Sequence, residues 1–303
     1  MGQLAGLKLV ETDTLTALIE AFLDEQSYRG NSKNTLEWYR KVFRILADHG
    51  VTRSEHLTRE GLVGFIAACR GRGLKPATVA NYDRALRVAL SWLHANGYIP
   101  QNPLAKLPRP KDKTEQVRPF TPDEIARILE SCQRRTHSRR AMALVLLLLD
   151  TGIRSGEAAN LTLRDIDWAE GLIRVNGKTG ERVVPFGRRA RRALLAYIDR
   201  ERKVPSPSIN SLFVAAQGAM DVESLNSFIT RIVRAAGLTR DKVGPHTFRH
   251  TFSVEFLKAG GNVFTLQRIL GHGRLVTTQR YVNLLTEDVK EAHRRFSPVD
   301  RMG

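Results

Sequence analysis

Residues 100–124 read PQNPLAKLPRPKDKTEQVRPFTPDE, and the first twenty of them contain five prolines. Proline breaks helices and keeps the residue before it extended, so this stretch predicts an interdomain linker. Its last four residues, Thr121 to Glu124, provide an N-cap threonine, a proline at the first helical position and a glutamate two residues later, which is a capping box. We therefore expect a first domain over residues 1–108, a linker over 109–119 and a second domain over 120–303.

The first domain is expected to be all-helical. Apolar residues recur in it at spacings of three and four, which is the period of an amphipathic helix. The pattern predicts four helices, over about residues 14–28, 34–49 and 59–70 and from Lys75-Pro76 to Asn96-Gly97. A small helical bundle is the natural packing for them.

The second domain combines helices with short strands. Residues 171–175 and 182–186 are β-type runs on either side of a turn at 177–180, which predicts a hairpin. Helical patterns cover about residues 138–150, 190–202, 222–236, 246–259, 263–270 and 278–295. The predicted fold class is therefore mainly α with one small antiparallel β-sheet (α+β) in the second domain.

Composition restricts the function. The chain of 303 residues carries a formal charge of +17, and both halves are basic, which favours a polyanionic partner such as nucleic acid. The longest apolar stretch, Ala141 to Leu149, is too short to span a membrane. The two cysteines, Cys69 and Cys132, support neither a disulfide framework nor a thiolate zinc site, so a reducing cytoplasm fits best.

Two motifs present arginines at the ends of helices. In Thr151-Gly-Ile-Arg-Ser-Gly-Glu157 the glycine suits a helix C′ position and Ser155 the next N-cap, so Arg154 lies on a tight turn. Arg154 could pair with Glu157 for structure, or Glu157 could hold its guanidinium ready for a phosphate. In Gly244-Pro-His-Thr-Phe-Arg-His250, His246 and Arg249 share a face near a helix start, which suits either an anion site or ordinary capping.

Two further side chains could carry chemistry. His246 and His250 have metal-ligand spacing, but the glutamate of the usual zinc motif is missing and no third ligand is evident, so we expect no metal. Tyr281 is expected in a first helical turn. A tyrosine hydroxyl is a poor nucleophile unless cations stabilise the phenolate, and most tyrosines in such a setting serve packing.

Taken together, the motifs resemble those of the tyrosine recombinases of the phage-integrase and Xer type. The resemblance spans nearly the whole chain and includes TGIRSGE, GKTGERVVP, HTFRH, LGHG and TTQRYV in the family's order. The chain departs from it in a hairpin one residue shorter than usual and in Gly273, where serine is frequent. The resemblance implies six catalytic residues, which are Arg154, Lys178, His246, Arg249, His272 and Tyr281. It assigns Glu157 and His250 as supporting residues.

The resemblance also implies a mechanism and partners. Tyr281 would form a 3′-phosphotyrosine with DNA, two arginines and His272 would bind the phosphoryl oxygens, Lys178 would protonate the leaving 5′-oxygen, and no cofactor would be needed. The first domain would be a core-binding domain, forming with the catalytic domain a C-shaped clamp around double-stranded DNA. A homotetramer would act through a Holliday junction on paired short inverted-repeat sites, with residues 287–296 docking onto a neighbour and accessory proteins possible.

The sequence leaves open whether the protein serves to integrate, excise or resolve DNA. Only about ten residues precede the first predicted helix, so an additional arm-binding domain is not expected. Two other functions remain as alternatives, a catalytically idle DNA-binding regulator on the same fold and a type IB topoisomerase-like relaxing enzyme. The expected location is the cytoplasm, in association with the nucleoid.

Overall fold

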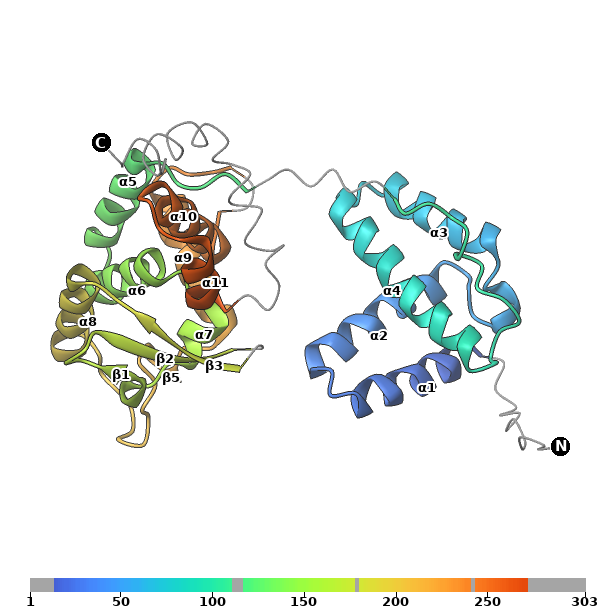
Figure 1. Cartoon of the computed structure of the whole chain (residues 1–303), viewed down its shortest axis with the longest axis horizontal. Helices are drawn as coiled ribbons and strands as arrows, with labels where there is room; N and C mark the ends of the chain where they lie inside the picture. Colours follow the sequence, from blue (N-terminus) through green and yellow to red (C-terminus); the bar gives the residue numbers. More distant parts are fainter. Residues whose placement is uncertain (1–13, 111–116, 178–179, 241–242, 272–303) are drawn as a thin grey trace, which may run out of the picture. The chain divides into compact units, whose positions relative to one another are not determined.

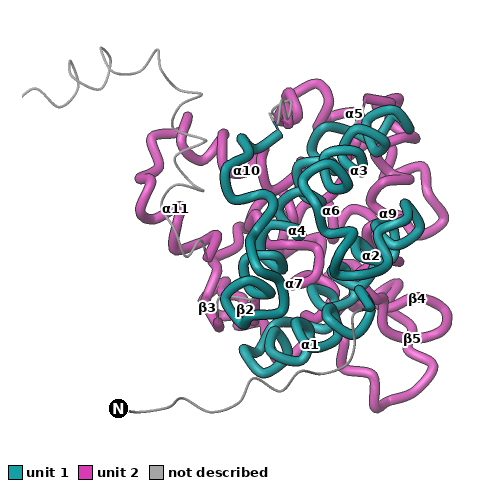
Figure 2. Tube along the Cα trace, turned by 90° about the vertical axis from the view of Figure 1, so that its right-hand side faces the viewer, with its two compact units in different colours: residues 1–115 teal, residues 116–303 magenta. Residues whose placement is uncertain are grey.

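The computed structural model describes residues 14–110, 117–177, 180–240 and 243–271 (Figure 1). The chain forms two compact units, residues 1–115 and 116–303 (Figure 2). Their boundary lies within the proline-rich segment. Both units are mainly helical and the second contains short antiparallel strands, so the predicted fold class is confirmed.

The first unit is built from four amphipathic helices. They are α1 (Leu15–Tyr28), α2 (Lys33–Asp48), α3 (Arg59–Gly71) and α4 (Pro76–Ala95), close to the predicted ranges. Ser32 and Thr58 cap α2 and α3 by accepting hydrogen bonds from backbone N–H groups. The apolar faces meet in a core that includes fully buried Phe22, Leu46 and Leu86.

The second unit is organised around one apolar helix. This helix, α6 (Ser138–Thr151), packs against α5 (Pro122–Gln133), α8 (Arg188–Arg200) and α10 (Pro245–Lys258) (Figure 1). Leu144, Leu147 and Leu148 on α6 have no exposed surface, which explains its nearly uninterrupted apolar sequence. The other α-helices in the described part of this unit are α7 (Ser155–Asn160), α9 (Val222–Ala235) and α11 (Val263–Leu270). In the described residues no helix is long and apolar enough to cross a membrane.

Residues 117–271, as far as the structure describes them, also form two small sheets. The larger has the order β1 (Ile166–Asp167), β2 (Leu172–Gly177), β3 (Gly180–Pro185), and the predicted β2–β3 hairpin is present. The prediction of a single sheet was wrong, because β4 (Val214–Ala215) and β5 (Gly218–Ala219) form a second one. Strands of two residues leave no alternating pattern in the sequence, so they could not be recognised there.

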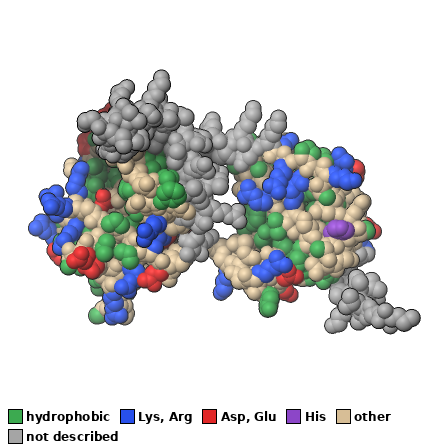
Figure 3. All heavy atoms as spheres, viewed as in Figure 1, with side chains coloured by type: hydrophobic (Ala, Val, Ile, Leu, Met, Phe, Trp, Pro, Cys, Tyr) green, Lys and Arg blue, Asp and Glu red, His purple; other side chains and the backbone are tan. Residues whose placement is uncertain are grey.

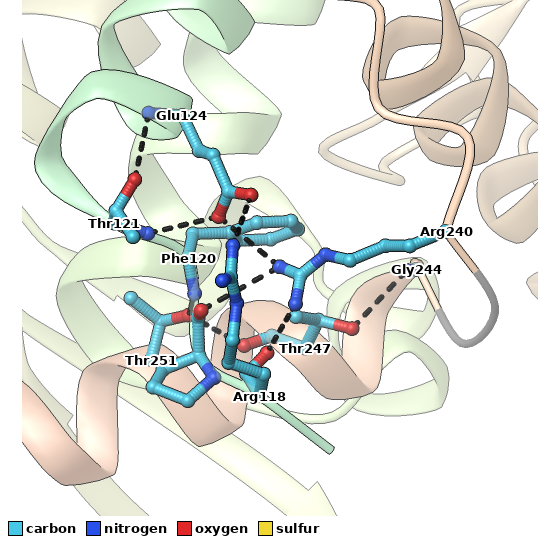
Figure 4. Close-up of polar contacts among 9 residues, drawn as sticks. Arg118, Phe120, Thr121, Glu124, Arg240, Gly244, Thr247 and Thr251 are labelled. Atoms are coloured by element: carbon cyan, nitrogen blue, oxygen red, sulfur yellow. Dashed lines mark hydrogen bonds and ion pairs between the residues drawn. The ribbon is translucent and has the colours of Figure 1, made fainter.

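A buried carboxylate, Glu124, joins the start of the second unit to the segment that leads into α10 (Figure 4). It completes the predicted capping box by accepting from the Thr121 N–H at 3.0 Å. It also accepts from Arg118 Nη2 at 2.7 Å and from Arg240 Nη2 at 3.2 Å. Burial alone would raise the pKa of Glu124, but the Thr121 hydrogen bond and the charges of Arg240 and Arg118 outweigh it and lower the pKa.

The same corner fixes α10 itself. The Phe120 N–H donates to Thr251 Oγ1 at 2.9 Å, and the Phe120 ring meets the Phe248 ring edge-on at 5.0 Å between centroids. The Arg240 guanidinium lies over the Phe120 ring, with its central carbon 5.3 Å from the centre of the ring. Because His246 and Arg249 lie within two residues of Phe248, these contacts fix the part of α10 that carries both residues.

Gly152 ends α6 in the left-handed conformation at φ +61°, as the sequence predicted. A Cβ added there would lie 2.4 Å from Phe252 Cδ1 and 3.0 Å from Leu270 Cδ2. We therefore expect Gly152→Ala to lower the unfolding free energy of the second unit by about 2–4 kcal/mol, from backbone strain and overpacking together. Urea unfolding measures the change.

Gly156→Ala is the matched control for this prediction. Gly156 lies four residues away in α7, and the atom nearest to its added Cβ is Val222 Cγ2 at 3.9 Å. Alanine is favoured over glycine inside a helix, so this variant should match or exceed the wild type in stability. Equal urea midpoints for the two variants would contradict the expectation.

Candidate active site

Arg154 lies on the turn between α6 and α7. The turn differs from the prediction in one detail, since Arg154 and not Ser155 is the N-cap: Arg154 is extended (φ −74°, ψ 153°) and Ser155 is already helical. The Arg154 N–H donates to Glu157 Oε2 at 2.8 Å, so the carboxylate serves as the cap. The expected side-chain pairing is also present, with Arg154 Nη1 donating to Glu157 Oε1 at 2.9 Å. The Arg154 side chain stays 31% exposed.

Arg182 on β3 is a second partner of Glu157, and it was not singled out from the sequence. Its Nη1 and Nη2 donate to Oε1 and Oε2 of Glu157, each at 2.8 Å, in a bidentate ion pair. A signal did exist: Arg182 pairs with buried Val175 and shares its strand face with buried Val184. A charged residue on the buried face of a strand requires a partner.

The two arginines strongly acidify Glu157. Burial alone would raise the pKa of this carboxyl, whose exposed fraction is only 4%. The hydrogen bonds from Arg182 and from the Arg154 backbone, together with the charge of Arg182, outweigh burial and lower the pKa to about 2. Glu157 is therefore an anion at neutral pH, and it holds two guanidinium groups in place.

Arg249 connects three elements of the second unit. It lies on α10 with an exposed fraction of only 5%. Its Nη1 donates to the Gly152 carbonyl at 2.8 Å and its Nη2 to the Leu270 carbonyl at 2.7 Å. These bonds join α10 to the turn that carries Arg154 and to the C-terminal end of α11, so the guanidinium is held on rigid supports.

His246 lies within electrostatic range of both arginines. Its pKa is lowered by burial and further by the positive charges of Arg249 and Arg154. The imidazole is therefore neutral at pH 7 and can accept a proton or a hydrogen bond. The structure thus brings together Arg154, His246 and Arg249, which the sequence places on two separate motifs.

His250 is placed differently from His246. Its pKa is lowered by burial, an effect that a hydrogen bond with the Val117 backbone partly opposes. This contact holds α10 against the segment that leads into α5. Among the described residues, no group of three His, Cys, Asp or Glu side chains is arranged to hold a metal ion.

Three of the six expected catalytic residues, Lys178, His272 and Tyr281, lie outside the described residues, as does the segment 287–296. Two described glycines directly precede two of these residues in the sequence. Gly177 is the last residue of β2 and directly precedes Lys178, and Gly271 ends α11 and directly precedes His272.

The chain is similar to known proteins in sequence and in fold. Residues 118–288 match the model of the phage integrase family. Tyrosine recombinase XerC of Oceanobacillus iheyensis is 30% identical over 296 residues, which cover 94% of this chain and 97% of that protein. The Tn1549 transposon integrase in complex with a circular intermediate DNA is 23% identical, with a TM-score of 0.77 over 89% of this chain and 95% of that chain.

A second solved structure shares the fold. The lambda integrase tetramer bound to a Holliday junction is 19% identical, with a TM-score of 0.72 over 88% of this chain and 80% of that chain. The matched family model covers more than half of this chain and includes the Arg154 turn, the β2–β3 hairpin and α10. The protein therefore belongs to the phage integrase family of tyrosine recombinases.

Proposed function

We propose that the protein is a site-specific recombinase that cuts and rejoins double-stranded DNA through a 3′-phosphotyrosine intermediate. The Tyr281 oxygen attacks the phosphorus, the bond to the 5′-oxygen breaks, and a 5′-hydroxyl leaves. The 5′-hydroxyl of a partner strand then attacks the phosphotyrosine and releases Tyr281. Each step exchanges one phosphodiester bond for another, so the reaction needs no cofactor.

The observation that carries this proposal is the convergence of Arg154 and Arg249 beside His246. Negative charge grows on the non-bridging phosphoryl oxygens in the transition state, and fixed cationic donors stabilise it best. Arg249 is held by two backbone carbonyls, and Arg154 is held by Glu157 through its backbone and its side chain. Both guanidinium groups are therefore oriented before a phosphate arrives, which lowers the reorganisation cost of the reaction.

His246 is suited to help deprotonate Tyr281. A general base must be neutral at the working pH, and burial together with Arg249 and Arg154 lowers the pKa of His246. We assign the other two roles by the resemblance of the motifs: Lys178 protonates the departing 5′-oxygen, and His272 donates a hydrogen bond to the phosphoryl oxygens. Glu157 and His250 are supports.

The proposed DNA complex uses both units. Lys and Arg side chains lie on both of them on the face that Figure 3 shows, in line with the charge of +17. The first unit would be the core-binding domain and would clamp double-stranded DNA together with the catalytic domain. We further propose a homotetramer on paired inverted-repeat sites that passes through a Holliday junction in the cytoplasm, with residues 287–296 exchanged between protomers.

Covalent trapping tests the proposal. Nicked duplexes from the DNA beside the protein's own gene should give a slow-migrating adduct on a denaturing gel, because the short strand released by cleavage diffuses away. Tyr281→Phe should abolish the adduct and leave the complex on native gels unchanged, since it removes only the attacking oxygen. Tyr28→Phe is the control, because the Tyr28 side chain on α1 is 92% exposed.

Two outcomes would contradict the proposal. A wild-type complex on native gels without any adduct would indicate an idle DNA-binding regulator. An adduct together with relaxation of supercoiled DNA that carries no paired sites would indicate a topoisomerase-like activity.

A further inference from the structure

We propose that Arg182 is a positioning residue of the recombinase, and that it holds Arg154 and the hairpin that carries Lys178 in one fixed arrangement. The inference rests on the proposed function, because it uses the roles assigned there to Arg154 and Lys178. It adds a residue whose importance lies in its contacts with other parts of the site.

Arg182 lies on β3, and its side chain contacts two other elements, α7 and α11. From β3 its Nη1 and Nη2 bind Glu157 on α7, each at 2.8 Å. Its Nε donates to the Ile269 carbonyl near the end of α11 at 2.6 Å. The side chain is only 11% exposed, so these bonds form largely out of water. Arg182 therefore ties the hairpin to Arg154 through Glu157, and to the end of α11 directly.

Two glycines pack against this ion pair, and each directly precedes an expected catalytic residue. A Cβ at Gly177 would lie 2.5 Å from Glu157 Oε1 and 3.4 Å from Arg182 Nη1. A Cβ at Gly271, where φ is +62°, would lie 3.0 Å from Arg182 Cδ. The chain thus passes directly against the pair just before Lys178 and again just before His272. A displacement of Arg182 would therefore shift the backbone at both Gly177 and Gly271.

The chemistry of arginine explains why this position requires it. A guanidinium is planar and can donate two parallel bonds to a carboxylate while Nε donates in a third direction. Lysine keeps the charge, but its single nitrogen cannot reach both Glu157 oxygens and the Ile269 carbonyl with that geometry. Arg182→Lys therefore tests the positioning and leaves the formal charge unchanged.

Leaving-group chemistry distinguishes positioning of Lys178 from a general loss of structure. A 5′-oxygen needs a proton as it departs, and Lys178 supplies it in the proposed reaction. A 5′-bridging sulfur departs as a thiolate without that proton, since thiols are far more acidic than alcohols. A defect in placing Lys178 is relieved by sulfur, whereas a defect in placing Arg154 is not.

The experiment measures the rate of covalent adduct formation by the full-length protein on nicked duplexes with either 5′-oxygen or 5′-sulfur. Misplacing a catalytic group by about 1 Å can cost about 100-fold in rate. We expect Arg182→Lys to slow the oxygen reaction by about that factor, and the sulfur substrate to restore part of the loss. Lys178→Ala should be restored almost completely.

Arg174→Lys is the matched control. Arg174 lies on β2 of the same hairpin, and its ion pair with Glu181 at 3.0 Å is well exposed, with 64% of the Arg174 side chain accessible. This variant should cleave both substrates at the wild-type rate. Gly177→Ala is a second test, and it changes no charge. The added Cβ would displace Glu157 from Arg182, so this variant should show the same partial restoration as Arg182→Lys.

Two results would overturn the inference. One is an Arg182→Lys rate equal to that of Arg174→Lys on the oxygen substrate. The other is an equal slowing on oxygen and sulfur by both Arg182→Lys and Gly177→Ala, which would remove the link to Lys178. If the wild type itself formed no adduct, or if Tyr281→Phe still formed one, the proposed function would fail instead.

Discussion

Replacing Arg249 with lysine is expected to slow formation of the covalent adduct by about 10²–10³-fold, which is the usual effect of removing one fixed donor from a charge-stabilising site. Arg249 is buried and donates to the Gly152 and Leu270 carbonyls at 2.8 and 2.7 Å. A lysine ammonium cannot satisfy both carbonyls and also face a phosphate in the same geometry. The remaining charge would be misplaced relative to the phosphoryl oxygens.

DNA binding should respond much less than cleavage. Non-specific affinity depends on the number of phosphates that cations neutralise, and lysine preserves the charge. Native gels should therefore show a complex at nearly the wild-type concentration of protein, while denaturing gels show little adduct. The comparison of the two gels separates a catalytic from a binding defect.

Arg268→Lys controls for the substitution itself. Arg268 lies on the same α11 whose end Arg249 contacts, but its side chain is exposed. Adduct formation by this variant should equal that of the wild type. An Arg249→Lys rate within tenfold of the Arg268→Lys rate would contradict a role of Arg249 in stabilising the transition state.

The second large effect is expected for Glu157→Gln, on stability as well as on cleavage. Removing one partner of a buried ion pair typically costs about 3–5 kcal/mol, because the remaining charge stays buried without compensation. Here Arg154 and Arg182 would face each other across a neutral amide that cannot accept all their hydrogen bonds. Thermal and urea unfolding of the second unit should show the loss at pH 7.

The same variant should change how stability depends on pH. The pKa of Glu157 falls from 4.5 to about 2 on folding. A lowered pKa means that the unfolded chain binds the proton more tightly, so the stabilisation is complete above pH 4.5 and is lost as the pH falls towards 2. At about 1.36 kcal/mol per pH unit, roughly 3 kcal/mol of wild-type stability should disappear over this interval.

Glu181→Gln is the control for both measurements. Glu181 lies on β3, next to Arg182, and its ion pair with Arg174 is 59% exposed on the carboxylate side, so its loss should cost little. The difference in stability between the wild type and Glu157→Gln should shrink as the pH falls from 4.5 to 2. A difference that stayed constant over this range would show that Glu157 does not titrate as its contacts require.

Much of the fold was predictable from local sequence patterns. The helices of the first unit follow directly from apolar spacing, and the start of α5 follows from the Thr121 to Glu124 capping box, because caps and amphipathic periods depend on residues within one or two turns. The β2–β3 hairpin and the glycine that ends α6 were visible for the same reason. The β4–β5 hairpin was not visible, since two-residue strands depend on neighbouring elements for their pairing.

The candidate site was also predictable only in part. The resemblance of the motifs to the family, in their order and spacing, selected Arg154, His246 and Arg249, since each motif by itself also allowed a purely structural role. Their convergence, and the contacts of Arg182 with Glu157 and Ile269, were decided only by the tertiary structure. Arg182 is 25 residues from Glu157 and 87 from Ile269 along the chain, and no local pattern encodes which distant group will neutralise a buried charge. That choice follows from how the hairpin, α7 and α11 pack together.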